Sequence, residues 1–428
     1  FQAAGYQTAM VGKWHLGHSQ ETFHPNSRGF DDFYGHLHTE VGYFPPFANQ
    51  GGIDFQRNGK TITDKGYETF LLAAEASRWI ENRDTEKPFF LYMPFIAPHT
   101  PLEAPEDLLI KYANLKDLRK PTRSASTDRI RSLSMTPSAR PIYAAVVDAL
   151  DQAIGQVLAT LESEGIDEET IILFSSDNGG ATYGGGGGDN YPLRGGKGET
   201  YEGGIKVIAA LRWKGHIAPQ TNFSSIMTMM DVFPTLAGAT NIPMMNTKKI
   251  WGRDMWSAIH GSETIPLTKE VFFASETPNY GQFHTTVFNE QWKLVQVISS
   301  SLMEVNVNNQ LFNIDDDPNE YNNLAADYPK LVELMAGKIR KWRALHPISG
   351  IRAQLVPPPG WRAPKDWTSY TIPINELQDD ASLGFGAHAH QILDYLIKDH
   401  GRIIYDCKPT DWERGKCKAP EKPHKHQH

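Results

Sequence analysis

The stretch Ile171-Ile172-Leu173-Phe174-Ser175-Ser176-Asp177-Asn178-Gly179-Gly180 joins a short apolar run to a polar turn rich in glycine. Four consecutive apolar residues predict a strand that is buried on both faces. In an open α/β sheet, ligands bind outside the carboxyl ends of the strands, which is where Asp177 and Asn178 are expected. Their side-chain oxygens are suitable ligands for Ca²⁺ or Mg²⁺. An Asx turn that ends the strand is the alternative interpretation.

Strand-like and helix-like segments alternate on both sides of this stretch. Residues 89–96 form a continuous apolar run between two prolines, and residues 205–211 form another. Apolar residues at helical spacing predict a helix over residues 142–164, which ends at Gly165, and a later helix around residues 227–236. This alternation predicts the α/β class, with a large, mixed but mostly parallel sheet sandwiched by helices.

The pattern changes after residue 265. Short β-prone segments at close spacing predict a small antiparallel sheet with strands at residues 271–273, 285–288, 292–297 and 310–314. A helix over residues 329–345 is expected to pack on this sheet. We therefore expect an α/β domain over residues 1–265, an antiparallel subdomain over residues 266–346 and an extended proline-rich tail over residues 347–428.

The composition is that of an ordinary globular protein. The 428 residues are 40% hydrophobic and 21% charged, and the formal net charge is −8. A general nucleic-acid-binding protein would present a basic surface, so nucleic acid is not an expected partner. No apolar run approaches the roughly 18 residues that a membrane-spanning segment needs, so no membrane span is expected.

The chain contains two cysteines, Cys407 and Cys417. They can close a short disulfide loop or remain two free thiols, and a disulfide would indicate an oxidising compartment. Asn222-Phe223-Ser224 is the only N-glycosylation sequence, which is weak support for the same compartment in a chain of this length. Two cysteines exclude a zinc site of the Cys₄ type.

Three further segments place lysines and histidines near predicted strand ends. In Gly12-Lys13-Trp14-His15, a lysine and a histidine two residues apart point the same way if the segment is extended. His99 follows the apolar run of residues 89–96, and Lys197 lies in the glycine-rich segment 195–198. For the Gly12-Lys13-Trp14-His15 segment, the alternative interpretation is a surface strand. For His99, the alternative is a structural histidine. Together with the polar turn, these residues suit a divalent cation and a compact dianion.

The order of these motifs resembles that of the sulfatase family. The matching segments are residues 5–17, 24–31, 98–102, 176–180, 192–195, 231–235 and 311–318. The resemblance covers residues 1 to about 345 and is strongest to the animal arylsulfatase B group, the N-acetylgalactosamine-4-sulfatases. It implies the alkaline-phosphatase-like sulfatase fold and hydrolysis of sulfate esters.

The resemblance implies catalytic roles for four residues. Lys13, His99 and Lys197 would hold the sulfate group, and His99 is the candidate acid for the leaving oxygen. His15 would form a hydrogen bond with the nucleophile. Fixed cations are suited to this reaction, because the transition state spreads negative charge over the sulfate oxygens.

The resemblance also implies a Ca²⁺ cofactor, with Asp177 and Asn178 as two of its ligands, and a formylglycine nucleophile. In the family, the nucleophile is made from the cysteine of a Cys-x-Pro-Ser-Arg motif that precedes the Gly-Lys-Trp-His motif. This sequence shows no such motif, and Met135-Thr136-Pro137-Ser138-Ala139-Arg140 has Met in place of the cysteine. We therefore expect that the N-terminal strand and nucleophile segment are missing from this sequence, or that a companion segment provides them.

Three functions remain open from the sequence. The first is a sulfuric ester hydrolase that acts on sulfated sugars or glycosaminoglycans, located in the lysosome or outside the cell. The second is a catalytically inactive relative that binds sulfated glycans or serves as a structural or storage protein. The third is a related phosphate-ester hydrolase, which would need a Ser or Thr nucleophile that the chain does not visibly offer. A homo-oligomer is compatible with each of them.

Overall fold

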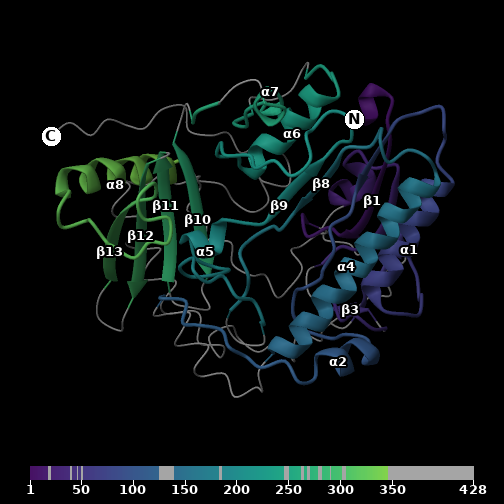
Figure 1. Ribbon diagram of the computed structural model, residues 1–428, viewed down its shortest axis with the longest axis horizontal. Helices are drawn as coiled ribbons and strands as arrows, with labels where there is room; N and C mark the ends of the chain where they lie inside the picture. The colour runs from purple at the N-terminus through teal and green to yellow at the C-terminus, as the bar shows by residue number, and fades with distance from the viewer. Residues whose placement is uncertain are drawn as a thin grey trace.

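The computed structural model describes residues 1–345 apart from short segments, namely 18–20, 39–40, 46, 50–51, 125–138, 183–185, 245–249, 262–264, 268–269, 278–281, 290 and 301–304. The predicted tail, with Cys407 and Cys417, lies outside the described residues, as do residues 135–138. Figure 1 shows an α/β body that contains the N-terminus and, beside it, a second sheet crossed by a helix.

A five-stranded sheet forms the centre of the α/β body. Its strand order is β6 (Lys60–Thr61), β5 (Gln56–Arg57), β2 (Asp32–His36), β1 (Gln7–Lys13) and β7 (Phe89–Tyr92). β1 pairs in parallel with both β2 and β7, whereas β5 and β6 are antiparallel additions. The interior of β1 is buried, as expected for a central strand that is covered on both faces. The carboxyl ends of the three parallel strands therefore share one edge of the sheet.

Two long helices, α1 (Glu68–Glu81) and α4 (Arg140–Ser163), lie side by side against this sheet (Figure 1). Leu72 of α1 and Val11 of β1 belong to the same buried cluster. Met10 belongs to a different cluster, because successive side chains of a strand point to opposite faces. Both faces of β1 therefore contribute to the hydrophobic core.

Within the described ranges, α4 is the one helix long and apolar enough, by length and composition, to cross a membrane. Here one face of it packs on the rest of the α/β body, and the other face is exposed. Val146 and Ala149 lie in a buried cluster with Leu108 of α2 (Glu106–Tyr112). Thr160 Oγ1 donates a hydrogen bond to Ser77 Oγ of α1 (2.8 Å). In this structure, α4 is a helix at the surface of the α/β body that buries one face.

β8 (Ile172–Ser175) and β9 (Ala209–Arg212) form a separate antiparallel pair. The prediction that the first of these strands is buried on both faces is wrong, because Leu173 is 37% exposed and Phe174 is 41% exposed. β7 is also shorter than predicted and ends at Tyr92, which is 45% exposed. Among the described residues, β7 and β8 are both edge strands. Each therefore lacks a neighbouring strand on one side, and the side chains near that side stay exposed.

Shorter elements connect the layers. They are η1 (Gln2–Ala4), η2 (Glu21–Phe23), η3 (Pro25–Ser27), β3 (Ala48–Asn49), β4 (Gly52–Ile53), α5 (Glu202–Ile205), α6 (Met229–Ala239) and α7 (Trp256–Ile259). α6 corresponds to the helix predicted around residues 227–236 and begins with a capping box formed by Thr228 and Asp231. The strand predicted over residues 205–211 is extended only in its second half, because α5 ends where it was expected to begin.

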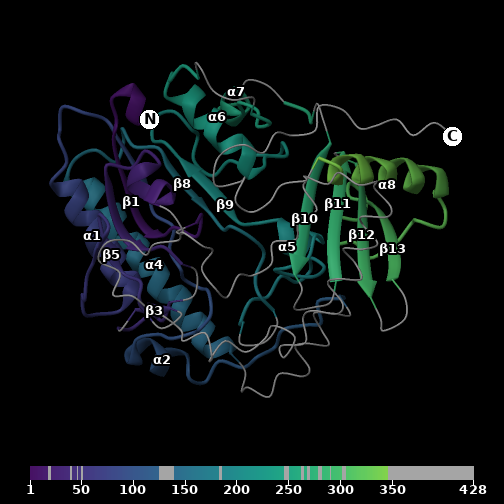
Figure 2. The ribbon, with the colours of Figure 1, turned by 180° about the vertical axis from the view of Figure 1, so that it is seen from behind.

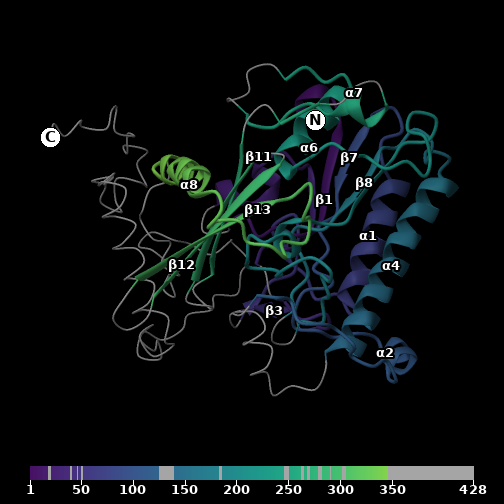
Figure 3. The same ribbon diagram turned by 60° about the vertical axis from the view of Figure 1, so that its left-hand side comes forward.

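The second sheet consists of four antiparallel strands in sequential order. They are β10 (Val271–Thr277), β11 (Gln282–Asn289), β12 (Trp292–Ser300) and β13 (Val305–Asn313). α8 (Pro329–Arg343) crosses this sheet, as Figure 2 and Figure 3 show. The core between them contains Val287, Leu294, Leu311, Met335 and Ile339. The predicted antiparallel sheet with a packed helix is confirmed, with strands longer than the sequence indicated.

Candidate active site

β1 ends at Lys13, on the edge where the parallel strands of the main sheet terminate. The preceding residue, Gly12, has φ 136°, and a Cβ there would lie only 2.3 Å from the carbonyl oxygen of Pro94. Only glycine allows such a close approach of two backbones. The backbone N–H of Lys13 donates to the same carbonyl (2.8 Å), which fixes Lys13 relative to the end of β7.

His15 follows in a left-handed backbone conformation, with φ 52°. This conformation is uncommon for residues with a Cβ and often marks a functional position. Its backbone N–H donates to the carbonyl of Leu37 (3.0 Å), just after β2. Next to it, Trp14 Nε1 donates to the carbonyls of Gly17 (3.1 Å) and Phe23 (2.8 Å). These bonds hold the segment that carries His15 at the strand edge.

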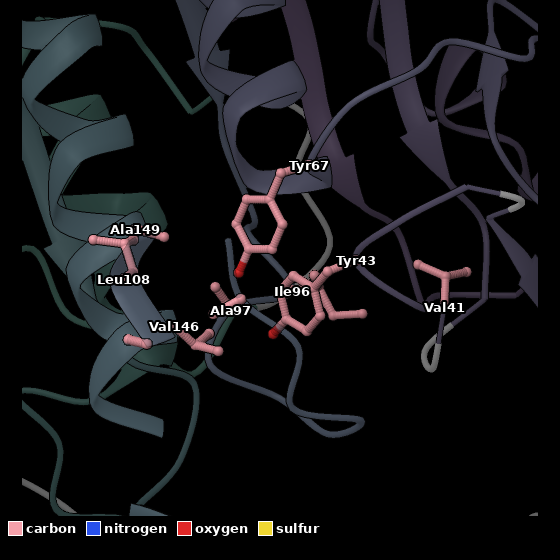
Figure 4. Packing of buried hydrophobic residues seen from close by; sticks show 10 residues of the cluster. Val41, Tyr43, Tyr67, Ile96, Ala97, Leu108, Val146 and Ala149 are labelled. Carbon is pink, nitrogen blue, oxygen red and sulfur yellow. The ribbon is translucent and has the colours of Figure 1, made fainter. Parts of the chain in front are cut away.

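His99 lies in the loop that follows β7. Its carbonyl accepts a hydrogen bond from Tyr43 Oη (2.9 Å), and Tyr67 Oη donates to the carbonyl of Glu103 in the same loop (2.9 Å). Figure 4 shows both tyrosines within a buried cluster, in which their rings stack with centroids 5.4 Å apart. The hydrophobic core therefore fixes the backbone around His99.

The ring of His99 is oriented by its own loop. Nδ1 lies 2.7 Å from the carbonyl oxygen of Thr100, and because a carbonyl only accepts, Nδ1 carries a proton. Nε2 is then the ring atom that exchanges a proton with a ligand. A histidine held in this way suits general acid–base chemistry.

The loop of Lys197 is bonded to the turn that follows β8. The backbone N–H of Lys197 donates to the carbonyl of Gly180 (3.2 Å). Asn190 bridges the two segments, because its Oδ1 accepts from the N–H of Gly180 (2.8 Å) while Nδ2 donates to the carbonyls of Gly180 (2.9 Å) and Gly195 (3.1 Å). The lysine loop and the turn therefore form one connected unit.

Three of the predicted residues, Lys13, His99 and Lys197, influence the charge state of the fourth, His15. Partial burial and the positive charges of Lys13, His38, His99 and Lys197 together lower the pKa of His15 to about 4. Charges have such an effect only when they lie close to the titrating group. The charged groups of Lys13, His99 and Lys197, which come from distant parts of the chain, therefore lie within electrostatic range of His15. At neutral pH, His15 is uncharged among groups that are cationic or can become so.

The sequence analysis missed His38. Its ring centroid lies 6.4 Å from that of His15, and its loop is held by Asp54. The buried Asp54 carboxylate accepts hydrogen bonds from the backbone N–H groups of Leu37 (2.9 Å) and His38 (2.7 Å). His38 follows a strand parallel to β1, and this position could have marked it as a candidate site residue. Nothing near Asp54 in the sequence marks its role.

Asp177 and Asn178, the two predicted calcium ligands, lie in the turn that follows β8. The Asp177 side chain is exposed and lies near Tyr92, whose pKa is raised by burial and by the negative charge of Asp177. Asn178 Nδ2 donates to the carbonyl of Gly179 (3.0 Å). In the described part of the chain, no group of three or more His, Cys, Asp and Glu side chains could hold a metal. Because Ca²⁺ takes about 6–8 oxygen ligands, two side chains do not complete its site.

Comparison with known proteins identifies the family. Residues 1–242, more than half of the chain, match the family model described as Sulfatase. The chain belongs to the sulfatase family. All six predicted site residues lie within the matched segment, so the sulfatase resemblance inferred from the motifs is confirmed at the level of the family.

Individual sulfatases are similar over most of the chain. Arylsulfatase J of Mus musculus is 27% identical over 388 residues, which is 79% of this chain and 60% of that protein. N-acetylgalactosamine-6-sulfatase of Mus musculus is 30% identical over 270 residues, 59% of this chain and 46% of that protein. The chain therefore spans less than two thirds of each of these relatives.

A solved structure supports the fold. The crystal structure of Ps i-CgsB in complex with k-i-k-neocarrahexaose is similar with a TM-score of 0.66 and 27% identity, covering 80% of this chain and 72% of that one. Together with the two sheets described above, this similarity confirms the predicted α/β sulfatase fold class.

Proposed function

We propose that this sulfatase-family chain provides the sulfate-binding and acid–base groups of a sulfuric ester hydrolase. The observation that carries this proposal is the placement of Lys13 and His15 at the end of β1, beside the segment that leads to His99, with Lys197 within electrostatic range of His15. A group of cationic side chains at the carboxyl ends of parallel strands suits a compact dianion such as a sulfate ester.

The two lysines are proposed to bind the sulfate oxygens. Cleavage of the ester increases negative charge on these oxygens, and fixed ammonium groups stabilise that charge without reorganising. Lys13 is fixed by its backbone bond to Pro94, and Lys197 by its bond to Gly180. His15, uncharged at neutral pH, can form hydrogen bonds to the reacting groups without a net charge of its own.

His99 is proposed as the acid for the leaving group. When the bond between sulfur and the ester oxygen breaks, that oxygen takes up a proton and leaves as an alcohol. His99 Nε2 would donate this proton, because Nδ1 is engaged with the carbonyl of Thr100. Water then completes the hydrolysis to free sulfate and restores the proton.

We propose Asp177 and Asn178 as two ligands of a Ca²⁺ ion whose remaining ligands come from outside the described residues. When bound, such an ion would add positive charge beside the sulfate group. The nucleophile is likewise proposed to come from elsewhere, because neither cysteine of this sequence, Cys407 or Cys417, stands in a Cys-x-Pro-Ser-Arg motif.

We also propose that a further strand, contributed by a companion segment, continues the sheet between β7 and β8. Phe89 of β7 and Ile172 of β8 pack in the same hydrophobic cluster, although the two strands are not paired with each other. Both strands leave apolar side chains exposed, and unpaired strand edges readily accept another strand. Native mass spectrometry of protein from its natural source would show a companion peptide, or a subunit heavier than 48.0 kDa.

Sulfated sugars are the proposed substrates, with a sulfated N-acetylgalactosamine unit of a glycosaminoglycan as the first choice. The names of the relatives, such as N-acetylgalactosamine-6-sulfatase, support this class, and the sequence resemblance to arylsulfatase B suggests the 4-sulfate. A lysosomal or extracellular location is proposed with it. The exposed position of Asn222 is compatible with glycosylation in such a compartment.

The decisive experiment is hydrolysis of a chromogenic aryl sulfate and of a panel of sulfated galactosamines by protein purified from its source. We expect turnover that is lost in the variants K197M and H99Q. Binding of the sulfated sugars without turnover, in a preparation shown to contain the nucleophile segment, would favour the glycan-binding alternative. The absence of both binding and turnover would contradict the proposal.

A further inference from the structure

A buried lysine connects the C-terminal sheet to the start of α5. Lys293 of β12 has no exposed surface, and its Nζ lies 2.7 Å from Glu202 Oε1 and 2.9 Å from Glu320 Oε1. Glu320 Oε2 also accepts a hydrogen bond from the backbone N–H of Glu202 (2.8 Å). Glu202 is the first residue of α5, so the side chain and the backbone of this helix start are both held. We call Lys293, Glu202 and Glu320 the buried triad.

The triad is stable only as a unit. Burial opposes a positive charge on Lys293, but Glu320 and Glu202 outweigh this effect and raise its pKa. Burial raises the pKa of Glu320, and the charge of Lys293 opposes that rise. Removal of Lys293 would leave two carboxyl groups in the interior without a counter-ion, which strongly favours displacement of one of them.

α5 is also in direct contact with both loops of the candidate site. The N–H of Gly203 donates to the carbonyl of Arg194 (2.7 Å), at the start of the lysine loop. The carbonyl of Gly204 accepts from the N–H of Gly179 (2.9 Å), in the turn after β8. A Cβ on Gly179 would lie 1.8 Å from the carbonyl oxygen of Gly203, so these backbones touch. Figure 1 and Figure 2 show α5 next to β10, between the second sheet and the α/β body.

We propose that the buried triad is a positioning device through which the C-terminal sheet sets the location of Lys197. Lys293 holds α5, and α5 holds the loop that carries Lys197. Lys293 is a positioning residue, because it acts on the site only through α5. The biological meaning of this inference rests on the proposed function, whereas its test does not depend on catalysis.

The test uses the pKa of His15 as a measure of where Lys197 lies. Histidine Cε1 resonances of the full chain, labelled with ¹³C and assigned with H15Q, are followed by NMR as a function of pH. K197M gives the reference, because loss of a nearby positive charge raises the pKa of His15. K293M is expected to raise this pKa in the same direction. K338M, which removes a partly exposed ion pair with Glu270 in the same sheet–helix unit, is expected to leave it unchanged.

A double variant separates positioning from general loosening. If Lys293 acts through Lys197, then K293M/K197M shows the same His15 pKa as K197M alone. A His15 pKa in the double variant that exceeds that of K197M by the rise seen in K293M would overturn the inference. A folded K293M protein whose His15 pKa equals that of the wild type would also overturn it. Should K293M fail to fold, E202Q serves in its place, because it keeps the pair of Lys293 with Glu320. E202Q is expected to give a smaller rise, and an unchanged His15 pKa in E202Q would overturn the inference.

The two proposals can fail separately. If the protein neither binds nor hydrolyses sulfate esters, but K293M still raises the pKa of His15, the proposed function is wrong and the positioning device stands. If the protein hydrolyses sulfate esters and K293M retains the wild-type KM, kcat and His15 pKa, the positioning inference is wrong and the function stands.

Discussion

The rings of His15 and His38 lie with their centroids 6.4 Å apart, just beyond the ends of two parallel strands. Lys13 of β1 is paired in register with His36 of β2, so each ring belongs to the second residue after this pair. Strand register, and not closeness in sequence, therefore brings the two imidazoles to the same edge. Lys13, Lys197 and His99 add positive charge around His15, and this is the basis for the proposed anion site at this edge.

Sulfate binding should raise the pKa of His15. A nearby anion stabilises the protonated imidazole, so we expect a rise from about 4 by about one to three pH units when sulfate is added. NMR titration of the His15 Cε1 resonance with and without sulfate measures this change. The exposed His216 lies at the opposite end of the β8–β9 pair and should not respond. An unchanged His15 pKa in saturating sulfate would argue against an anion site at this edge.

Loss of either lysine should reduce catalysis strongly. We expect K13M and K197M each to lower kcat/KM for a sulfate ester by roughly 10²–10³-fold, because each removes a fixed positive group from the developing charge. Steady-state kinetics on the active protein measure the effect. K60M, which removes an exposed lysine at the far edge of the main sheet, is the matched control and should behave as wild type. Equal activity of all three variants would refute the assigned roles.

Asp54 should prove essential for the loop of His38. D54A leaves the backbone N–H groups of Leu37 and His38 without their acceptor, and unsatisfied buried donors each cost about 1–3 kcal/mol. We expect the free energy of unfolding to fall by roughly 2–6 kcal/mol in D54A, and by less in D54N, which keeps one acceptor. Urea denaturation measures both variants. A D54A protein with wild-type stability would show that the loop does not depend on this carboxylate.

Asp231 should stabilise the protein above acidic pH. Burial alone would raise its pKa, but hydrogen bonds from Arg253 and Thr228 outweigh burial and lower the pKa below its usual value. A carboxylate with a lowered pKa contributes stability above its unfolded pKa of about 3.9, and this contribution is lost as pH falls through the folded pKa. We expect D231N to be less stable than wild type by about 1–3 kcal/mol at pH 7. Denaturation measurements near pH 3 should show a smaller difference in the free energy of unfolding between wild type and D231N. A difference that stays the same at both pH values would contradict this interpretation.

Two glycine substitutions should have opposite effects. A Cβ on Gly155, on the exposed side of α4, meets no atom within 4 Å, so G155A should stabilise the helix by about 0.5–1 kcal/mol. A Cβ on Gly179 would lie 1.8 Å from the carbonyl oxygen of Gly203, so G179A should destabilise the protein and displace α5. Thermal denaturation compares the pair. A stable G179A would show that the turn and α5 can separate without cost.

Local patterns predicted most elements correctly. The helix predicted over residues 142–164 is α4, and the helix predicted over residues 329–345 is α8. Helical spacing of apolar residues depends on neighbours within one or two turns, so the sequence contains the necessary information. The same kind of pattern failed for the burial of β8, because burial depends on which strands lie next to it. The division into three parts and the roles of the site residues stay predictions.

The sequence by itself determined the family, the α/β class with its second antiparallel sheet, and the identity of Lys13, His15, His99 and Lys197 as candidates. These follow from short motifs and local periodicity. Only the tertiary structure decided that the charges of Lys13, His99 and Lys197 act on His15, that the ring of His38 lies beside it, and that Lys293 is buried between Glu202 and Glu320. Such relationships depend on strand register and on contacts between residues far apart in the chain, which local sequence patterns do not encode.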